Sequence, residues 1–163
     1  MASEIGRIVE LLAAHREIEQ KIYRMGYALE DGDFAEVGRL LRHATFGADR
    51  IGREVFRGED EIRGQYERTN RTYPGQGRAT REMYTNVLVD IDLDAGTATS
   101  TTAYTVAQQV PDTDRPFELL VAGRYEDRWV VIDGEWHWTD RFVVVQFKND
   151  LNRHMHTGSQ PYN

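Results

Sequence analysis

Residues 123–145, "GRYEDRWVVIDGEWHWTDRFVVV", decide the fold that the sequence predicts. Aromatic and β-branched residues, which favour strands, fill both halves of this stretch. Between the halves stands Asp133-Gly134, a pair typical of the two-residue turn that joins antiparallel strands. The stretch therefore predicts a β-hairpin with strands over about residues 117–132 and 135–147.

A second pair of strands precedes this hairpin. Residues 80–92 and 97–109 alternate between two faces, and the short segment "DLDAG" between them is a plausible turn. Strands of this length must curl. Gly123 lies inside one of them, where a bulge or bend is expected.

The first half of the chain has helical patterns. Ser3 can cap a first helix whose apolar residues recur at helical spacing, and Gly32 suits its left-handed end. Asp33 begins a second helix, residues 47–58 suggest a short strand, and residues 59–71 predict a third helix. Helices followed by an antiparallel meander indicate an α+β fold, in which a long amphipathic helix laid across a curled sheet encloses a conical cavity.

Length and composition exclude several classes of protein. The 163 residues predict a single domain, 1–163, whose polar tail, 150–163, wraps the surface or frays. A net charge of −7 and a pI near 5.2 argue against nucleic-acid and anionic-membrane partners. No cysteine is present, which excludes disulfides and thiolate chemistry. No apolar run approaches the ~18 residues of a membrane span and no signal peptide is visible, so a cytoplasmic location is expected.

Four stretches together resemble a known family: "YALEDGDFAEVGRLL", "TREMYTNVLVDIDLDAGTATSTTAY", "AGRYEDRWVVIDGEWHWTDRFVVV" and "DLNRHM". They are similar to the SnoaL-like branch of the NTF2-like (cystatin-like) superfamily, over about residues 8–156. The resemblance implies N-terminal helices packed on a strongly curved antiparallel or mixed sheet that encloses a cavity. This superfold hosts lyases, isomerases, oxygenase subunits and simple binding modules, so it leaves the function open.

Two positions of the resemblance bear on catalysis. Members similar to scytalone dehydratase carry an aspartate near the end of the first helix and a histidine at the start of the "TREMYTN" strand. Here these positions fall on Glu30, or alternatively Asp31, and on Glu82. A carboxylate in an apolar cavity has a raised pKa, and two carboxylates that share a cavity can act as acid and base. The alternative is that both are surface acids, Glu82 being paired with Arg81 or Arg78.

Strand alternation predicts which residues accompany Glu82. Glu82, Tyr84, Asn86 and Leu88 are expected on one face, with Met83 on the other. Tyr84 and Tyr23 are candidates to hold a developing oxyanion or to help a hydroxyl depart. The other expected substrate contacts are Tyr27, Met83, Asn86, Leu88, Tyr104 and Trp138. Each aromatic residue taken alone is more often part of a core.

The five histidines give no metal site. His15 falls in the apolar stripe of the first helix, His43 ends the second, and His137 lies on a strand. His154 and His156 have a spacing seen in metal sites, but no third local ligand accompanies them. We therefore expect neither a metal nor a cofactor.

Two functions remain open. The first is a cofactor-independent lyase or isomerase that acts on a small apolar, aromatic or polycyclic molecule in the cavity. The second is a non-catalytic small-molecule-binding module, or the small subunit of an assembly similar to ring-hydroxylating oxygenases. In both cases we expect a homodimer or homotrimer, with the strand "RFVVVQF", residues 141–147, as a suitable interface.

Overall fold

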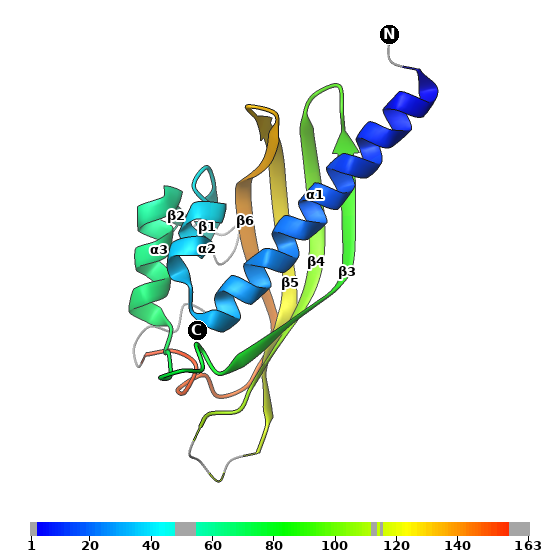
Figure 1. The fold of residues 1–163 in the computed structure, drawn as a ribbon. Helices are drawn as coiled ribbons and strands as arrows, with labels where there is room; N and C mark the ends of the chain where they lie inside the picture. Colours follow the sequence, from blue (N-terminus) through cyan, green and yellow to red (C-terminus); the bar gives the residue numbers. More distant parts are fainter. Residues whose placement is uncertain (1–2, 48–54, 112–113, 115, 157–163) are drawn as a thin grey trace.

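A computed structural model of the chain describes residues 3–47, 55–111, 114 and 116–156, and within them it contains three helices and one six-stranded sheet (Figure 1). The helices are α1 (Glu4–Asp31), α2 (Phe34–Leu40) and α3 (Gly58–Thr69). The strands are β1 (Thr45–Gly47), β2 (Val55–Arg57), β3 (Thr80–Asp92), β4 (Thr97–Gln108), β5 (Glu118–Ile132) and β6 (Glu135–Lys148). The expected α+β architecture is confirmed.

The sheet is mixed and curved. Its strand order is β2-β1-β6-β5-β4-β3, and β1 runs parallel to β6 while the other neighbours are antiparallel. The expected irregularity at Gly123 is confirmed, because the register between β5 and β6 shifts between Ala122 and Gly123. A Cβ atom at Gly123 would lie 2.0 Å from the carbonyl oxygen of Val144, so only glycine permits this close approach.

Helix α1 crosses the sheet diagonally, and its first half extends beyond it (Figure 1). Ser3 caps its start by accepting a hydrogen bond from the backbone of Gly6, and Gly32 ends it with a φ of 71°. The second half buries Ile18, Ile22 and other apolar side chains in the core that the sheet forms. Helices α2 and α3 lie together at the β1–β2 end of the sheet (Figure 1). No helix in the described part of the chain is long and apolar enough to cross a membrane.

Two segments with sequence-based expectations are only partly within the described residues. The single short strand predicted within residues 47–58 is represented by β1 and β2, which pair with each other, and residues 48–54 lie outside the described residues. The expected tail, 150–163, is described only as far as residue 156, and residues 149–156 are anchored to the segment after α3. Met155 forms a β-bridge with Asn70, and the backbone carbonyl of His154 accepts a hydrogen bond from the backbone N–H of Arg71.

A bulge in β3 changes the face that its second half presents. Thr85 pairs with Ala103, but the next paired residue is Leu88, and Asn86 between them has a φ of 51°. The prediction that Asn86 and Leu88 share the face of Glu82 is therefore wrong. Both are exposed, Leu88 to 68%, because the extra residue reverses the alternation and turns Val87 inward instead.

Candidate functional site

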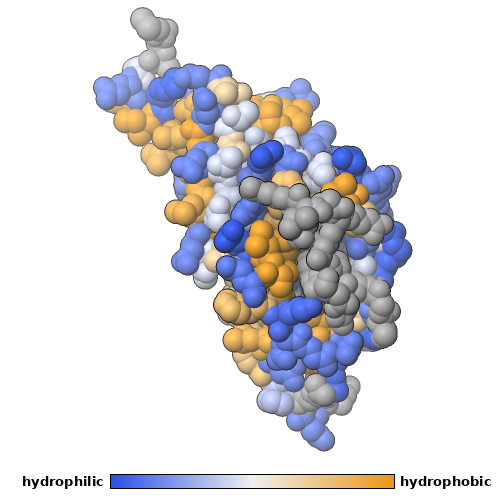
Figure 2. Space-filling model, turned by 180° about the vertical axis from the view of Figure 1, so that it is seen from behind, coloured by the Kyte–Doolittle hydropathy of each residue, from blue (hydrophilic) through white to orange (hydrophobic). Residues whose placement is uncertain are grey.

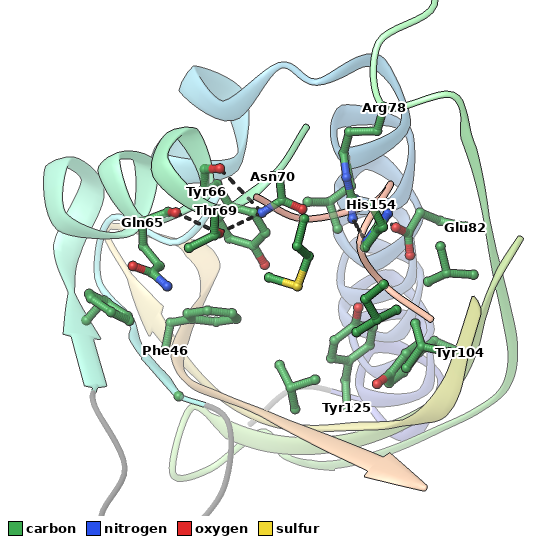
Figure 3. Close-up of a pocket in the computed structure, with 18 residues that line it drawn as sticks. Phe46, Gln65, Tyr66, Thr69, Asn70, Arg78, Glu82, Tyr104, Tyr125 and His154 are labelled. Atoms are coloured by element: carbon green, nitrogen blue, oxygen red, sulfur yellow. Dashed lines mark hydrogen bonds and ion pairs between the residues drawn. The ribbon is translucent and has the colours of Figure 1, made fainter. Parts of the chain in front are cut away.

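A cavity of about 290 Å³ lies between α1, α3, the curved sheet and the tail (Figure 3). Its apolar walls are Leu29, Phe46, Gly47, Phe56, Val106, Val121, Val143, Leu151 and Met155. Its polar walls are Gln65, Tyr66, Thr69, Asn70, Arg78, Glu82, Tyr104, Tyr125 and His154. A mostly apolar cavity with a few convergent polar groups is the usual form of a small-molecule site.

Glu82 contributes a carboxylate to this cavity from the start of β3. Its side chain is only 2% exposed, and its Oε1 accepts a hydrogen bond of 2.8 Å from Nη1 of Arg78. Its Oε2 is buried and has no hydrogen-bond partner among the described residues. Burial raises the pKa of Glu82, and the neighbouring Arg78 acts against this rise. The carboxylate therefore has one oxygen held in place and one free to accept a proton.

Arg78 joins Glu82 to a third polar side chain. Its second terminal nitrogen, Nη2, lies 2.6 Å from Nε2 of His154. His154 is 6% exposed, and burial, together with the charge of Arg78, lowers its pKa well below the ordinary value. The imidazole is therefore neutral at neutral pH. We call these three residues the Glu82–Arg78–His154 cluster (Figure 3).

Glu30 does not line this cavity. Its Oε1 accepts a hydrogen bond of 2.7 Å from the backbone N–H of Glu82, and its Oε2 accepts one of 2.6 Å from Arg81. Its backbone carbonyl accepts the N–H of Arg78 at 2.9 Å. Glu30 thus fixes the backbone that carries both Glu82 and Arg78, and this placement makes it a positioning residue.

Three further predicted residues lie outside the cavity, in a groove between α1 and β3. This groove is also lined by Glu30, Glu82 and Tyr84. Tyr23 and Tyr27 on α1 are 37% and 65% exposed, and Met83 on β3 is 38% exposed. The helix buries Ile22 and Met25 instead, so tyrosines one and two residues further along turn away from the sheet. The expectation that these side chains contact a ligand in the cone is not supported by their position.

The remaining aromatic candidates have different surroundings. Tyr104 lines the cavity and stacks on Tyr125 with ring centres 4.4 Å apart. Tyr84 is not part of the cavity lining. It packs edge-on against Tyr125, with ring centres 5.6 Å apart. Trp138 is fully buried and packs against Trp129, with ring centres 4.0 Å apart. It does not line the cavity. Its position in the closed core does not support its expected role as a substrate contact.

A buried ion pair supports the sheet beneath the cavity. Nη1 of Arg141 lies 3.3 Å from Oδ2 of Asp127 across the β5–β6 hairpin. The guanidinium also lies 3.8 Å above the ring of Tyr125. Burial raises the pKa of Asp127 to about 6, although Arg141 opposes the rise.

Sequence reasoning missed most of the polar cavity wall. Arg78 lies in a loop with two glycines and one proline and was expected only as one alternative ion-pair partner of Glu82, a pairing that the structure confirms. His154 was considered only as a metal ligand with His156. Neither position gives a local signal, because the two meet only when the tail folds back over α3 and β3. Among the described residues, no three histidine or acidic side chains are grouped so as to hold a metal ion.

Comparisons with known proteins agree with this architecture. The profile of the SnoaL-like domain matches residues 10–141. No curated protein sequence matches the chain. Among solved structures, it is similar to Rv3472, a protein of unknown function from Mycobacterium tuberculosis, with 21% identity, a TM-score of 0.70, and 88% of this chain and 78% of that one covered.

Two other similar structures have names that suggest functions. One is a putative scytalone dehydratase from Novosphingobium aromaticivorans, with 20% identity, a TM-score of 0.66, and 85% and 88% of the two chains covered. Another is the β subunit of a putative aromatic-ring-hydroxylating dioxygenase from the same organism, with 12% identity, a TM-score of 0.66, and 90% and 97% covered. At these identities the similarity shows a shared fold.

Proposed function

Since this chain belongs to the SnoaL-like domain family, we propose that it is a cofactor-independent lyase or isomerase acting on a small, largely apolar ring compound. The observation that carries the proposal is the carboxylate of Glu82. It lines an apolar cavity, its Oε1 is held by Arg78, and its buried Oε2 has no partner among the described residues. A desolvated carboxylate of this kind is a competent proton acceptor.

Glu82 takes a proton from a carbon next to a carbonyl group of the bound compound. In an elimination, the bond between the next carbon and its hydroxyl group then breaks, and the hydroxide leaves as water with the proton that Glu82 held. In an isomerisation, Glu82 returns the proton to a different carbon. A positioned base contributes about 10²–10⁴-fold, and orientation in the cavity adds to it. Tyr104 and Tyr125, which also line the cavity, supply aromatic surface for a flat substrate.

Hydrogen exchange of a simple ketone tests this role of Glu82. We expect the protein to accelerate the exchange of the α-hydrogens of 1-indanone in D₂O, followed by proton NMR. The variant Glu82→Gln should lose about 10²–10⁴-fold of the acceleration, because an amide cannot take up the proton. Glu67→Gln is a matched control, since Glu67 pairs with Arg63 on the exposed side of α3. A folded Glu82→Gln variant with the wild-type exchange rate would contradict the proposal.

A non-catalytic binding module is the second candidate function. It is favoured by the engagement of both carboxylates in ion pairs, Glu82 with Arg78 and Glu30 with Arg81. The similarity to a dioxygenase β subunit is compatible with the same reading at the level of the fold. A wild-type protein that binds 1-indanone without accelerating its hydrogen exchange supports this candidate over the enzyme.

We also infer that the protein forms a homo-oligomer. Five large apolar residues of α1 are exposed on its projecting first half, Ile5, Ile8, Val9, Leu11 and Leu12. Figure 2 shows hydrophobic surface on this projecting end. Ile5, Ile8 and Leu12 follow the three- and four-residue spacing with which helices pack against each other, which suits a second copy of α1. The strand 141–147 remains the alternative interface, with Phe147 exposed to 72%.

A further inference from the structure

The hydrogen bond between Arg78 and His154 determines which nitrogen of the imidazole ring carries the proton. Its Nε2 lies 2.6 Å from Nη2 of Arg78. A guanidinium group has only donors, so Nε2 must be the acceptor of this hydrogen bond. The single proton of the neutral ring is therefore on Nδ1. Arg78 thus selects one tautomer of His154.

The Nδ1–H group is a buried donor that has no partner among the described residues. The backbone around it is anchored, because the N–H of His154 donates to the carbonyl of Leu151 at 2.9 Å and its own carbonyl accepts from Arg71 at 3.0 Å. Buried donors almost always have partners, so this one calls for an explanation. His154 lines the same cavity as Glu82, whose Oε2 is also unpartnered (Figure 3).

We propose that His154 contacts the substrate directly, with its Nδ1–H donating a hydrogen bond to a carbonyl oxygen of the bound compound. The carbonyl lies against His154 while the neighbouring carbon faces Oε2 of Glu82. When Glu82 takes the proton, negative charge develops on the carbonyl oxygen, and a fixed donor stabilises it. The inference rests on the proposed function for the role of Glu82, and it names the substrate class as small ring compounds with a carbonyl group.

The binding of two matched compounds tests the contact without any turnover. 1-Indanone and indane share one ring skeleton, and only the first has a carbonyl oxygen. In His154→Gln, the amide oxygen can still accept from Arg78, but no donor remains at the position of Nδ1. We expect the ratio of indanone to indane affinity, measured by NMR titration, to fall by about 3- to 10-fold in this variant. His154→Asn, whose amide can place a donor near Nδ1, should retain more of the ratio.

Each outcome decides for or against the contact. If His154 serves only as the acceptor for Arg78, His154→Gln leaves the affinity ratio unchanged, and the proposal is overturned. The affinity for indane serves as the internal control for the integrity of the cavity. Failure of the proposed function is a separate result, because a protein without hydrogen exchange can still show the ratio change.

The tautomer itself can be read in the wild-type protein. Long-range ¹⁵N–¹H correlation spectra distinguish the two neutral forms of histidine, and sequential resonance assignment of the wild-type protein identifies the signal of His154. We expect the Nδ1–H form for His154 at neutral pH, because Arg78 occupies Nε2. Observation of the Nε2–H form would overturn the proposal, even if the variant failed to fold.

Discussion

Arg78 influences the protonation states of Glu82 and His154 in the direction that their proposed roles require. Its positive charge favours the ionised form of Glu82 and disfavours the protonated form of His154. Arg78 is itself only 4% exposed, and its backbone carbonyl accepts a hydrogen bond of 3.0 Å from the side chain of Gln108. One buried cation therefore holds a proton acceptor and a neutral donor in fixed positions beside each other.

The pH dependence of stability provides a check on His154. The unfolded chain protonates this residue near the ordinary pKa of 6.5, whereas the folded chain resists protonation. Below that pH the unfolded state binds more protons, so the free energy of unfolding falls. In His154→Gln this loss is absent. We expect urea unfolding to show a smaller fall between about pH 7.5 and about pH 5.5 in the variant than in the wild type.

Two other buried groups change the free energy of unfolding in the opposite direction as the pH falls. The experiment therefore compares the wild type with the His154→Gln variant. The folded-state pKa values of Glu82 and Asp127 are raised, so these groups stabilise the fold as the pH falls. Both remain in the variant, so the difference between the two proteins isolates His154. Equal pH dependence in the two proteins would contradict the lowered pKa of His154.

At the level of elements, the bulge of β3 separates the cavity-facing part of the strand from its outer part. Residues before it, such as Glu82, point inward on one alternation, and residues after it, such as Val89, point inward on the other. Asn86 occupies the left-handed region with a φ of 51°, which asparagine tolerates better than branched residues do.

Substitution of Asn86 tests this conformation. Asn86→Val should lower the free energy of unfolding by about 1–2 kcal/mol, because a β-branched side chain is strained at positive φ. Asn86→Gly should be neutral or slightly stabilising by comparison, since glycine adopts this region without strain. Urea unfolding measures both. Equal stability of the two variants would show that the bulge is absent or that its φ is negative.

At the level of the whole molecule, α1 has two roles along its length. Its second half covers the sheet and contributes Leu29 to the cavity wall, whereas its first half projects with apolar residues exposed. Arg7 ties this half to Asp94 in the β3–β4 turn through two hydrogen bonds of 2.7 and 2.9 Å. The projecting half thus keeps a defined place relative to the sheet and can present a fixed apolar stripe.

Sedimentation equilibrium of two variants tests where a second copy binds. We expect a wild-type mass above that of one chain and a single-chain mass for Leu12→Glu, because a charge in the α1 stripe opposes helix–helix packing. Phe147→Asp is the matched variant on the alternative strand and should keep the wild-type mass. The reverse result would place the interface on the strand 141–147. A monomeric wild type would contradict the inference of a homo-oligomer.

Local patterns in the sequence were sufficient for most of the fold. The Asp133-Gly134 turn, the cap at Ser3, the end of α1 and the start of α2 depend on backbone preferences within a few residues, and all lie where the sequence predicts them. The second helix ends at Leu40, before the expected His43. The bend at Gly123 was predictable for the same reason. Positions of this kind express a local constraint that one residue type satisfies best.

The sequence by itself determined the order and type of the three helices and the four long strands, the curved sheet of an α+β fold, and the presence of an acid at the head of β3. Only the tertiary structure decided which side chains meet in the cavity. The bulge at Asn86 reverses strand alternation, and the tail brings His154 to Arg78 across 76 positions of the chain. Glu30, 52 positions from Glu82, holds its backbone instead of sharing its cavity. Such contacts depend on long-range packing, which a local pattern cannot encode.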